Sequence, residues 1–341
     1  MSKIFCFILA LLFTTVPLAA TAQDHDITAK TPEFKLPVDC ELGENCWIVN
    51  YVDMDSGEGA KDFKCNARSY NGHKGTDFAV SSMADVTTGV DVLAPLAGTV
   101  LRVRDGEPDT LKSKEDLEAI RAARRECGNG LLIDHSAAGF PGLSTVYCHL
   151  KQGSIVVQPD DVVIGGQKIA QIGHSGEAEF PHLHFGVTWK NGVTDPFSGA
   201  QNSEGCGQEK QSLWASDEAV SYEAGAIFDA GFSETAPDFG AIKAGETQPE
   251  ALKSSAQALI FWAAFYGVEA GDEITLEIVA PDGLRIVKRN ITQEKTRARQ
   301  YYYTGRKSTG GAIEAGVYKG LATLSRGGQT IEQKTEMIAV R

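Results

Sequence analysis

Six of the seven histidines lie between residues 73 and 184, and three short segments present four of them in patterns that can do chemistry. The first segment is Asn71-Gly72-His73-Lys74-Gly75-Thr76-Asp77. Its two glycines disfavour a helix, so we expect a bend that folds the His73 imidazole back beside the Asp77 carboxylate. An imidazole and a carboxylate presented together are good zinc ligands. The alternative is a turn in which the two side chains only hydrogen-bond to each other.

The second segment is Phe180-Pro181-His182-Leu183-His184-Phe185. Residues two apart on a β-strand point to the same side, so His182 and His184 emerge together while Leu183 and Phe185 face the core. Two adjacent imidazoles on one face favour a metal or a proton-transfer role. The alternative is a pair of surface histidines.

The third segment, Thr145-Val146-Tyr147-Cys148-His149-Leu150, ends a β-branched run with His149, which alone would suggest a structural histidine. The three segments together supply four imidazoles and one carboxylate. A catalytic zinc commonly takes three protein ligands and keeps a fourth position for water. Two groups are then left for proton transfer and charge stabilisation, which hydrolysis requires. A purely structural zinc site is disfavoured because such sites usually use four ligands.

The elements that must position these groups are expected to be short antiparallel strands, because β-branched residues alternate with glycine-rich turn signals. We expect strands at residues 91–94, 98–103, 131–134 and 144–149. One helical excursion interrupts them, since Ser113-Lys114-Glu115-Asp116 matches a capping box and precedes a run of helix formers.

The C-terminal part of the chain is expected to be a small β-sandwich over residues 257–341, joined by a polar linker over residues 207–256. Ile274, Leu276 and Ile278 alternate as in a half-buried strand, and residues 325–329 have the composition of a tight hairpin turn. The sandwich contains no histidine and no cysteine. The sequence therefore predicts an all-β protein whose chemistry lies in the first half of the chain.

Residues 1–22 have the layout of a cleaved signal peptide, with Lys3, an apolar run from Ile4 to Val16 and small residues ending at Ala22. The run is too short to span a bilayer, which needs ~20 apolar residues. We therefore expect a periplasmic or secreted protein without a transmembrane anchor.

Six cysteines follow the predicted cleavage point, and an exported chain would pair them in up to three disulfides with fifteen possible connectivities. Cys40 and Cys46 are close enough to close a small loop. Cys127 and Cys148 flank two candidate paired strands, and Cys65 with Cys206 is left by elimination. Strand alternation directs Cys148 away from the side on which His149 emerges.

The charge balance is acidic, with 32 Lys and Arg against 45 Asp and Glu. This balance argues against nucleic acid as a partner, because nucleic-acid binders normally present a basic field. The sequence does not indicate an oligomeric state.

The order His-x-Gly-x-Asp, Tyr-x-His-Leu, His-Leu-His-Phe resembles the lysostaphin/LytM-type zinc metallopeptidases, which cut peptidoglycan cross-links. The resemblance extends from about Cys40 to Phe197 and includes the segment Gly128–His135 and Asp195-Pro196-Phe197. It implies a LytM-like catalytic domain over residues 23–206, built from antiparallel sheet with a helical insertion. It further implies that His73, Asp77 and His184 bind Zn²⁺ and that His149 and His182 are the catalytic histidines.

The expected function is that of an exported zinc endopeptidase acting on the peptide cross-links of peptidoglycan. The alternative is a non-catalytic LytM-like protein that regulates or binds the cell wall. A degenerate relative is expected to lose ligands, whereas all five positions are filled here. The sequence leaves open the scissile bond, whether D-Ala to a diamino acid or Gly to Gly, and the division of roles between His149 and His182.

Overall fold

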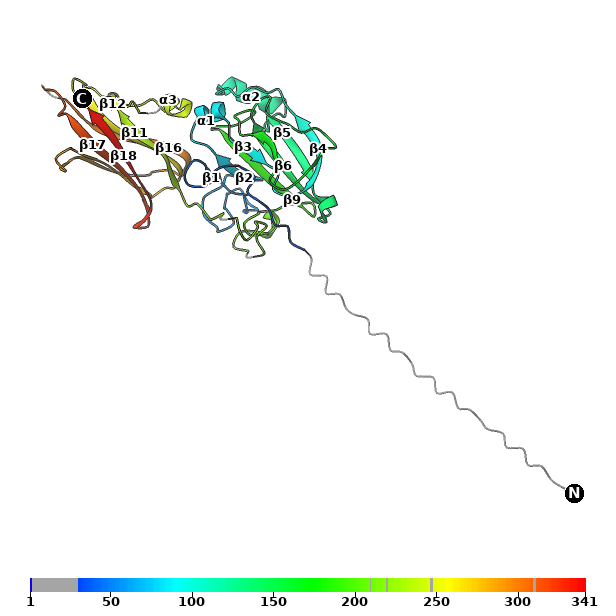
Figure 1. Cartoon of the computed structure of the whole chain (residues 1–341). Helices are drawn as coiled ribbons and strands as arrows, with labels where there is room; N and C mark the ends of the chain where they lie inside the picture. The colour runs from blue at the N-terminus through cyan, green and yellow to red at the C-terminus, as the bar shows by residue number, and fades with distance from the viewer. Residues whose placement is uncertain (2–29, 209, 219, 246–247, 309–310) are drawn as a thin grey trace. The chain divides into compact units, whose positions relative to one another are not determined.

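Antiparallel β-sheets carry most of the regular structure, which confirms the predicted all-β class (Figure 1). The computed structural model describes residue 1 and residues 30–208, 210–218, 220–245, 248–308 and 311–341. The predicted signal peptide, apart from Met1, lies outside the described residues. Residues 31–341 form one compact unit.

The first half of the chain builds an eight-stranded sheet in the order β1-β2-β9-β6-β5-β4-β7, with β10 paired to β9. Its strands are β1 (Trp47–Asn50), β2 (Thr76–Ala79), β4 (Gly98–Arg104), β5 (Asn129–Asp134), β6 (Leu143–Leu150), β7 (Val162–Val163), β9 (His182–Trp189) and β10 (Gly192–Val193). Strands β3 (Asp91–Leu93) and β8 (Lys168–Gln171) form a separate antiparallel pair. The four predicted strands are confirmed, with ends shifted by one or two residues.

The core beneath this sheet explains why β9 is fixed in place. Leu183 and Phe185 are fully buried, as their alternation with the histidines predicts, and they pack with Phe78, Tyr147 and Ile133 in one apolar cluster. A shift of one residue in the register of β9 would turn this apolar face outward. The core therefore determines which side of the sheet His182 and His184 occupy.

Three α-helices occur within the described part of the chain. They are α1 (Met83–Thr88), α2 (Lys114–Ala122) and α3 (Phe239–Ala244). The predicted helical excursion is α2, and the Ser113 side chain accepts a hydrogen bond from the Asp116 amide in the expected capping box. Two short 3-10 turns, Ser136–Ala138 and Asn202–Glu204, complete the helical structure.

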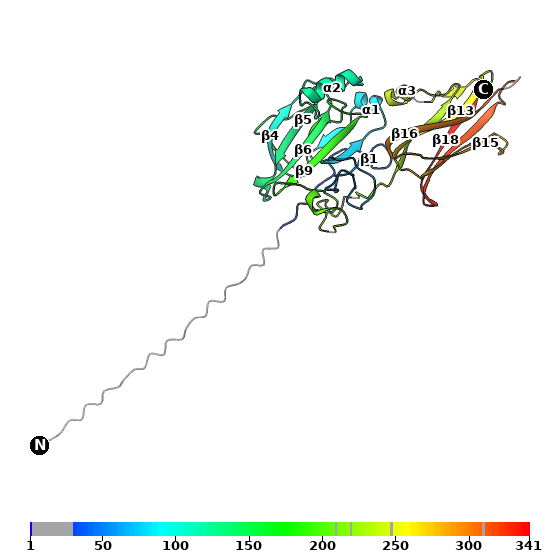
Figure 2. The same cartoon turned by 180° about the vertical axis from the view of Figure 1, so that it is seen from behind.

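The C-terminal part forms two facing sheets, one in the order β11-β13-β16 and the other in the order β12-β18-β17-β14-β15 (Figure 2). The strands are β11 (Ala226–Ser233), β12 (Ala251–Leu252), β13 (Ala258–Val268), β14 (Glu273–Val279), β15 (Arg285–Thr292), β16 (Arg297–Lys307), β17 (Gly316–Arg326) and β18 (Gln329–Val340). Ile274, Leu276 and Ile278 are buried between the sheets, and Arg326 pairs with Gln329 across the predicted hairpin turn.

The segment 207–256, expected to be a linker, contributes structure to this sandwich. Strand β11 pairs with β13 over Ala226–Ser233, and β12 pairs in parallel with the end of β18. The domain boundaries given above stay a prediction.

An apolar cluster joins the first sheet to the C-terminal sheets. It contains Trp47, Val49, Ala79 and Phe180 on one side, and Ala226, Phe228, Ile242, Trp262, Ala264 and Tyr266 on the other. Beside it, the buried Arg68 guanidinium lies against Gly267, where an added Cβ would fall 0.7 Å from Arg68 Nη1. Gly267 also has φ of +62°, so both space and backbone require glycine there.

The described residues contain three disulfides, Cys40–Cys46, Cys65–Cys206 and Cys127–Cys148. The cysteine positions allowed these three pairings among the fifteen possible, with Cys65–Cys206 reached only by elimination. Within the described residues, no helix has the length and apolar character needed to cross a membrane.

Candidate active site

Strand pairing brings two of the predicted metal ligands together. In the antiparallel ladder between β2 and β9, Asp77 lies directly opposite His184, and Ala79 lies opposite His182. Directly opposed residues of such a ladder have their Cβ atoms about 5 Å apart. The spacing of two between His182 and His184 places both imidazoles on the same face of the sheet as Asp77.

The bend before β2 brings in His73. Gly72 takes a positive φ of +79°, and the His73 amide closes a turn by donating to the Tyr70 carbonyl. The His73 Nδ1 donates to the buried Tyr51 carbonyl at 2.7 Å, which leaves Nε2 turned toward the strands. This Nε2 lies 3.0 Å from Asp77 Oδ1 and 3.0 Å from His184 Nδ1.

The three groups form one candidate metal site, because their ligand atoms all lie within 4.8 Å of one another. The donor set of two imidazole nitrogens and one carboxylate oxygen is typical of zinc sites that keep an open position. The second oxygen of Asp77 and the second ring nitrogen of His73 also have hydrogen-bond partners. Asn50 Nδ2 donates to Asp77 Oδ2 at 2.9 Å, as the partners of metal ligands usually do. The side chains therefore fit a zinc ion.

The protonation states of Asp77 and His184 agree with this fit, whereas for His73 burial is outweighed by Asp77, which raises the pKa of this imidazole. Burial opposes a charge on Asp77, but the imidazoles of His73 and His182 outweigh it and hold the pKa of this carboxyl well below its usual value. Burial lowers the pKa of His184, although Asp77 opposes that shift. Asp77 is thus a carboxylate and His184 a neutral imidazole near neutral pH, which are the forms that bind metals.

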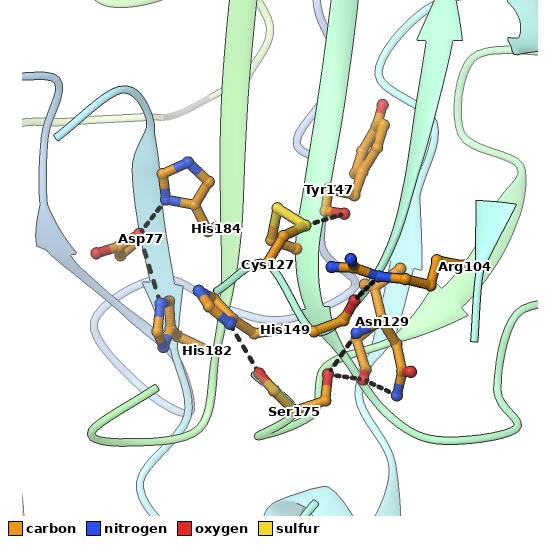
Figure 3. Close-up of a disulfide and its surroundings, with 12 residues drawn as sticks. Asp77, Arg104, Cys127, Asn129, Tyr147, His149, Ser175, His182 and His184 are labelled. Carbon is orange, nitrogen blue, oxygen red and sulfur yellow. Dashed lines mark hydrogen bonds and ion pairs between the residues drawn. A yellow bond between two sulfur atoms is a disulfide. The ribbon is translucent and has the colours of Figure 1, made fainter. Parts of the chain in front are cut away.

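His149 and His182 lie beside Asp77 and His184 (Figure 3) but do not belong to the ligand cluster. His182 Nε2 lies 3.6 Å from Asp77 Oδ1. The ring centroids of His149 and His182 are 4.6 Å apart. His149 Nδ1 donates to the Ser175 carbonyl at 2.8 Å, and His182 Nδ1 donates to the Phe180 carbonyl at 2.8 Å. A carbonyl can only accept, so each ring carries its proton on Nδ1 when neutral, and each Nε2 keeps a lone pair.

Burial, reinforced by the neighbouring rings of His182 and His184, holds the pKa of His149 well below its usual value. A neutral His149 is therefore able to accept a proton at Nε2 near neutral pH. All five residues predicted from the sequence border the same cavity.

The cavity has a volume of about 650 Å³. Its lining consists of Asn50, Tyr70, Gly72, His73, Lys74, Asp77, Glu126, Cys127, Cys148, His149, Glu177, Glu179, Phe180, His182, His184 and Ala298. A cavity of this size falls in the range of small-molecule and peptide sites. Ala298 comes from β16, so the C-terminal sheets contribute to the cavity wall.

Two lining residues that contact the ligand candidates, Tyr70 and Asn50, are not indicated by the sequence motifs. The Tyr70 ring stacks on the His73 ring with centroids 4.4 Å apart, and Asn50 orients Asp77. Asn50 lies opposite Asp77 because β1 pairs with β2. This pairing joins distant parts of the chain, so no local motif could have identified Asn50.

The predicted orientation of Cys148 is wrong, because Cys148 and His149 both border the cavity. Regular alternation would place consecutive residues on opposite faces. His149 instead has a positive φ of +62°, which breaks the pleat of β6 at this position. A non-glycine residue in this region costs of order 1–3 kcal/mol and persists only where the surroundings enforce it.

Known proteins resemble the part of the chain that carries this site. Residues 71–196 match the model of peptidase family M23. The match covers 126 of the 341 residues, so this segment, called the M23 domain below, is similar to peptidase family M23. All five predicted site residues lie inside the matched range. The match supports a peptidase at the level of the family.

Solved structures also resemble part of this chain. A zinc-containing peptidase from Vibrio cholerae is 27% identical, with a TM-score of 0.27 and coverage of 43% of this chain and 39% of that chain. The chain thus spans about two fifths of the length of this peptidase. The catalytic domain of lysostaphin from Staphylococcus simulans is 21% identical, with a TM-score of 0.26 and coverage of 43% and 89%. A chain of the SpoIIQ–SpoIIIAH pore-forming complex is 21% identical, with a TM-score of 0.33 and coverage of 51% and 94%. No curated protein sequence matches this chain.

Proposed function

We propose that this protein is an exported zinc-dependent endopeptidase that hydrolyses the peptide cross-links of peptidoglycan. The observation that carries the proposal is the convergence of His73, Asp77 and His184 into one ligand cluster with His149 and His182 on the same cavity. A site that only binds a metal has no use for two further imidazoles that hold Nδ1 on a carbonyl oxygen and can take up a proton at Nε2.

His73 Nε2, Asp77 Oδ1 and His184 Nδ1 are the atoms that would hold zinc. When bound, zinc polarises a peptide carbonyl and lowers the pKa of a bound water toward ~7. The Tyr51 carbonyl orients His73, and the Asn50 amide orients Asp77, so the ligands are held in place before any metal arrives.

The two other histidines would handle protons. With Nδ1 bound to a carbonyl, the Nε2 of either His149 or His182 can accept the proton of the attacking water. The proton must then reach the leaving amine, and the charged imidazole meanwhile stabilises the negative charge that develops on the carbonyl oxygen. The 4.6 Å separation of the rings allows both to reach one substrate bond.

Export is supported by the three disulfides, because such bonds persist in oxidising compartments outside the cytoplasm. The signal-peptide pattern of residues 1–22 points the same way. A peptidase of this family placed in the periplasm or secreted would have the cell wall within reach.

The test is a digest of purified sacculi with the zinc-loaded protein, with and without a chelator, followed by mass spectrometry of the released fragments. We expect cleaved cross-links in the zinc-loaded digest and none with chelator. Sacculi with direct D-Ala to diamino-acid links and sacculi with glycine bridges should be digested in parallel, because the fragments identify the scissile bond. Zinc-loaded protein that cleaves neither type would overturn the proposal in favour of a non-catalytic wall-binding protein.

A further inference from the structure

We propose that the Cys127–Cys148 disulfide is a positioning element of the active site, which fixes the backbone at His149 and so directs its imidazole into the cavity. This inference rests on the proposed function only for its kinetic readout. Both cysteines border the cavity, whereas Cys40–Cys46 and Cys65–Cys206 are absent from its lining. The other two disulfides therefore provide natural controls.

The first argument is the place of the disulfide on the strand. Cys148 immediately precedes His149 on β6 and lies directly opposite the metal-ligand candidate His184 on β9. In Figure 3, Cys127 lies beside His149. The disulfide to Cys148 links Cys127 to β6 one residue before His149. The disulfide thus holds the one part of β6 that faces the site.

The second argument is the irregular backbone that the disulfide spans. Between β5 and β6 the register skips, because Asn129 pairs with Leu150 while Leu131 pairs with Tyr147. Cys148 and His149 therefore face only Gly130. An added Cβ at Gly130 would lie 2.5 Å from the Tyr147 carbonyl oxygen and 2.8 Å from Cys127 Sγ, so the strand and the disulfide together fill the space that a side chain would need. The irregular pairing of β5 with β6 and the Cys127–Cys148 disulfide thus occur at the same place in the sheet.

Cys127 holds both residues of this irregularity. Its sulfur is bonded to Cys148, and its carbonyl accepts a 2.8 Å hydrogen bond from the His149 amide. That amide has turned away from the regular ladder because His149 has φ of +62°. Without the cross-link, the strand would be free to relax toward extended backbone, which non-glycine residues prefer.

The third argument concerns the acceptor of the His149 ring. The Ser175 carbonyl binds His149 Nδ1, while the Ser175 hydroxyl accepts from the Asn129 amide at 2.9 Å and donates to the Leu150 carbonyl at 2.7 Å. Asn129 follows Cys127 by two residues, and Leu150 follows Cys148 by two. The ring and its acceptor are consequently anchored to the same two segments that the disulfide joins.

The test compares two zinc-loaded full-chain variants, C127A/C148A and the matched control C40A/C46A. We expect C127A/C148A to bind one zinc like the parent but to lose at least about tenfold in kcat, with a smaller change in KM, because a displaced proton-transfer group affects turnover more than binding. The control should keep kcat within about twofold of the parent. A general loss of stability would instead affect both variants, which thermal unfolding measures.

A second readout needs no turnover. Nitrogen-15 NMR of the imidazoles should report His149 protonated at Nδ1 in the parent and in C40A/C46A, and an altered tautomer distribution in C127A/C148A. If the proposed peptidase function fails, this measurement still tests the positioning role. Unchanged His149 signals in C127A/C148A, or a kcat equal to that of the control at full zinc content, would overturn the inference.

Should C127A/C148A fail to fold, the folded C40A/C46A protein can be treated with a phosphine and alkylated. Each reduced disulfide gains two electrons and two protons to become two thiols, while the phosphine takes oxygen from water and becomes its oxide. Mass mapping then gives the fraction of Cys127 and Cys148 alkylated. We expect kcat to fall in proportion to that fraction. A kcat that follows alkylation of Cys65 and Cys206 instead would contradict the proposal.

Discussion

The Tyr266 hydroxyl donates a 2.8 Å hydrogen bond to the Val80 carbonyl, and both residues are buried. Val80 immediately follows strand β2, which carries Asp77. The Tyr266 ring also contacts the Phe180 ring at a centroid distance of 5.6 Å, and the Phe180 carbonyl binds His182. One residue of β13 thus supports the two segments that carry a metal-ligand candidate and a proton-transfer histidine.

Replacing Tyr266 by Phe should lower the free energy of unfolding by about 1–3 kcal/mol, because the buried Val80 carbonyl would lose its donor. Urea denaturation of the purified variants measures this change. Tyr303→Phe is the control, since Tyr303 is 37% exposed, and it should change stability by less than about 0.5 kcal/mol. Equal stabilities of the two variants would mean that the hydrogen bond contributes nothing.

Ala298 tests whether the C-terminal sheets form part of the substrate-binding surface. Because Ala298 borders the cavity, Ala298→Trp should obstruct it and lower kcat/KM on cross-linked muropeptides by roughly tenfold or more. The exposed Ala315 lies outside the lining, so Ala315→Trp should leave kcat/KM unchanged. Both variants should bind zinc normally, and an unaffected Ala298→Trp enzyme would place the substrate elsewhere.

The two kinds of histidine should respond differently to removal. His184→Ala should lose zinc together with activity, because it deletes one of three ligands. His149→Ala should keep zinc and lose a factor of roughly 10²–10⁴ in kcat, the usual contribution of a proton-transfer group. Metal analysis and steady-state kinetics of both variants decide the matter, and full activity of His149→Ala would remove this residue from the mechanism.

The stability of the M23 domain should depend on pH through Asp195. Burial, together with the nearby Asp62, raises the pKa of Asp195 to about 6, although hydrogen bonds from Ser198 oppose the shift. Between the ordinary value of 3.8 and about 6, the folded protein holds a proton that the unfolded chain has released. Stability is therefore lost as the pH rises through this interval, by about 3 kcal/mol in total.

Asp195→Asn should remove this contribution, because the amide cannot ionise and its oxygen can still accept from Ser198. Urea denaturation of both proteins at pH 4 and pH 7 measures the difference. The parent should lose more stability than the variant between these two values. A parallel change in the two proteins would show that Asp195 keeps an ordinary pKa in the folded chain.

The parts of the site that follow local rules could be predicted from the sequence. His182 and His184 share a face because the side chains of a strand alternate with a period of two. The glycines around His73 indicate the bend that brings its imidazole beside Asp77. The helix at Lys114–Ala122 could be predicted for the same reason, since its capping box is local.

The features that depend on contacts between distant segments escaped prediction. Cys148 faces the cavity because it lies opposite His184, and His149 borders the same cavity because its left-handed backbone conformation breaks the strand alternation. No pattern within the segment from Thr145 to Leu150 indicates this. Ala298 borders the cavity although it lies more than 100 residues after the histidines in the sequence. Strand β11 was expected to belong to a linker because it is surrounded by polar, glycine-containing sequence.

The apolar cluster around Trp47, Ala79 and Phe180 has a practical consequence for anyone preparing this protein. A clone truncated at residue 206 would retain all five site residues, yet it would expose these side chains to water along with the Arg68 guanidinium that now rests on Gly267. Such a fragment should be poorly soluble and prone to aggregation. Crystallisation and enzymology are therefore best carried out with a chain that keeps the C-terminal sheets.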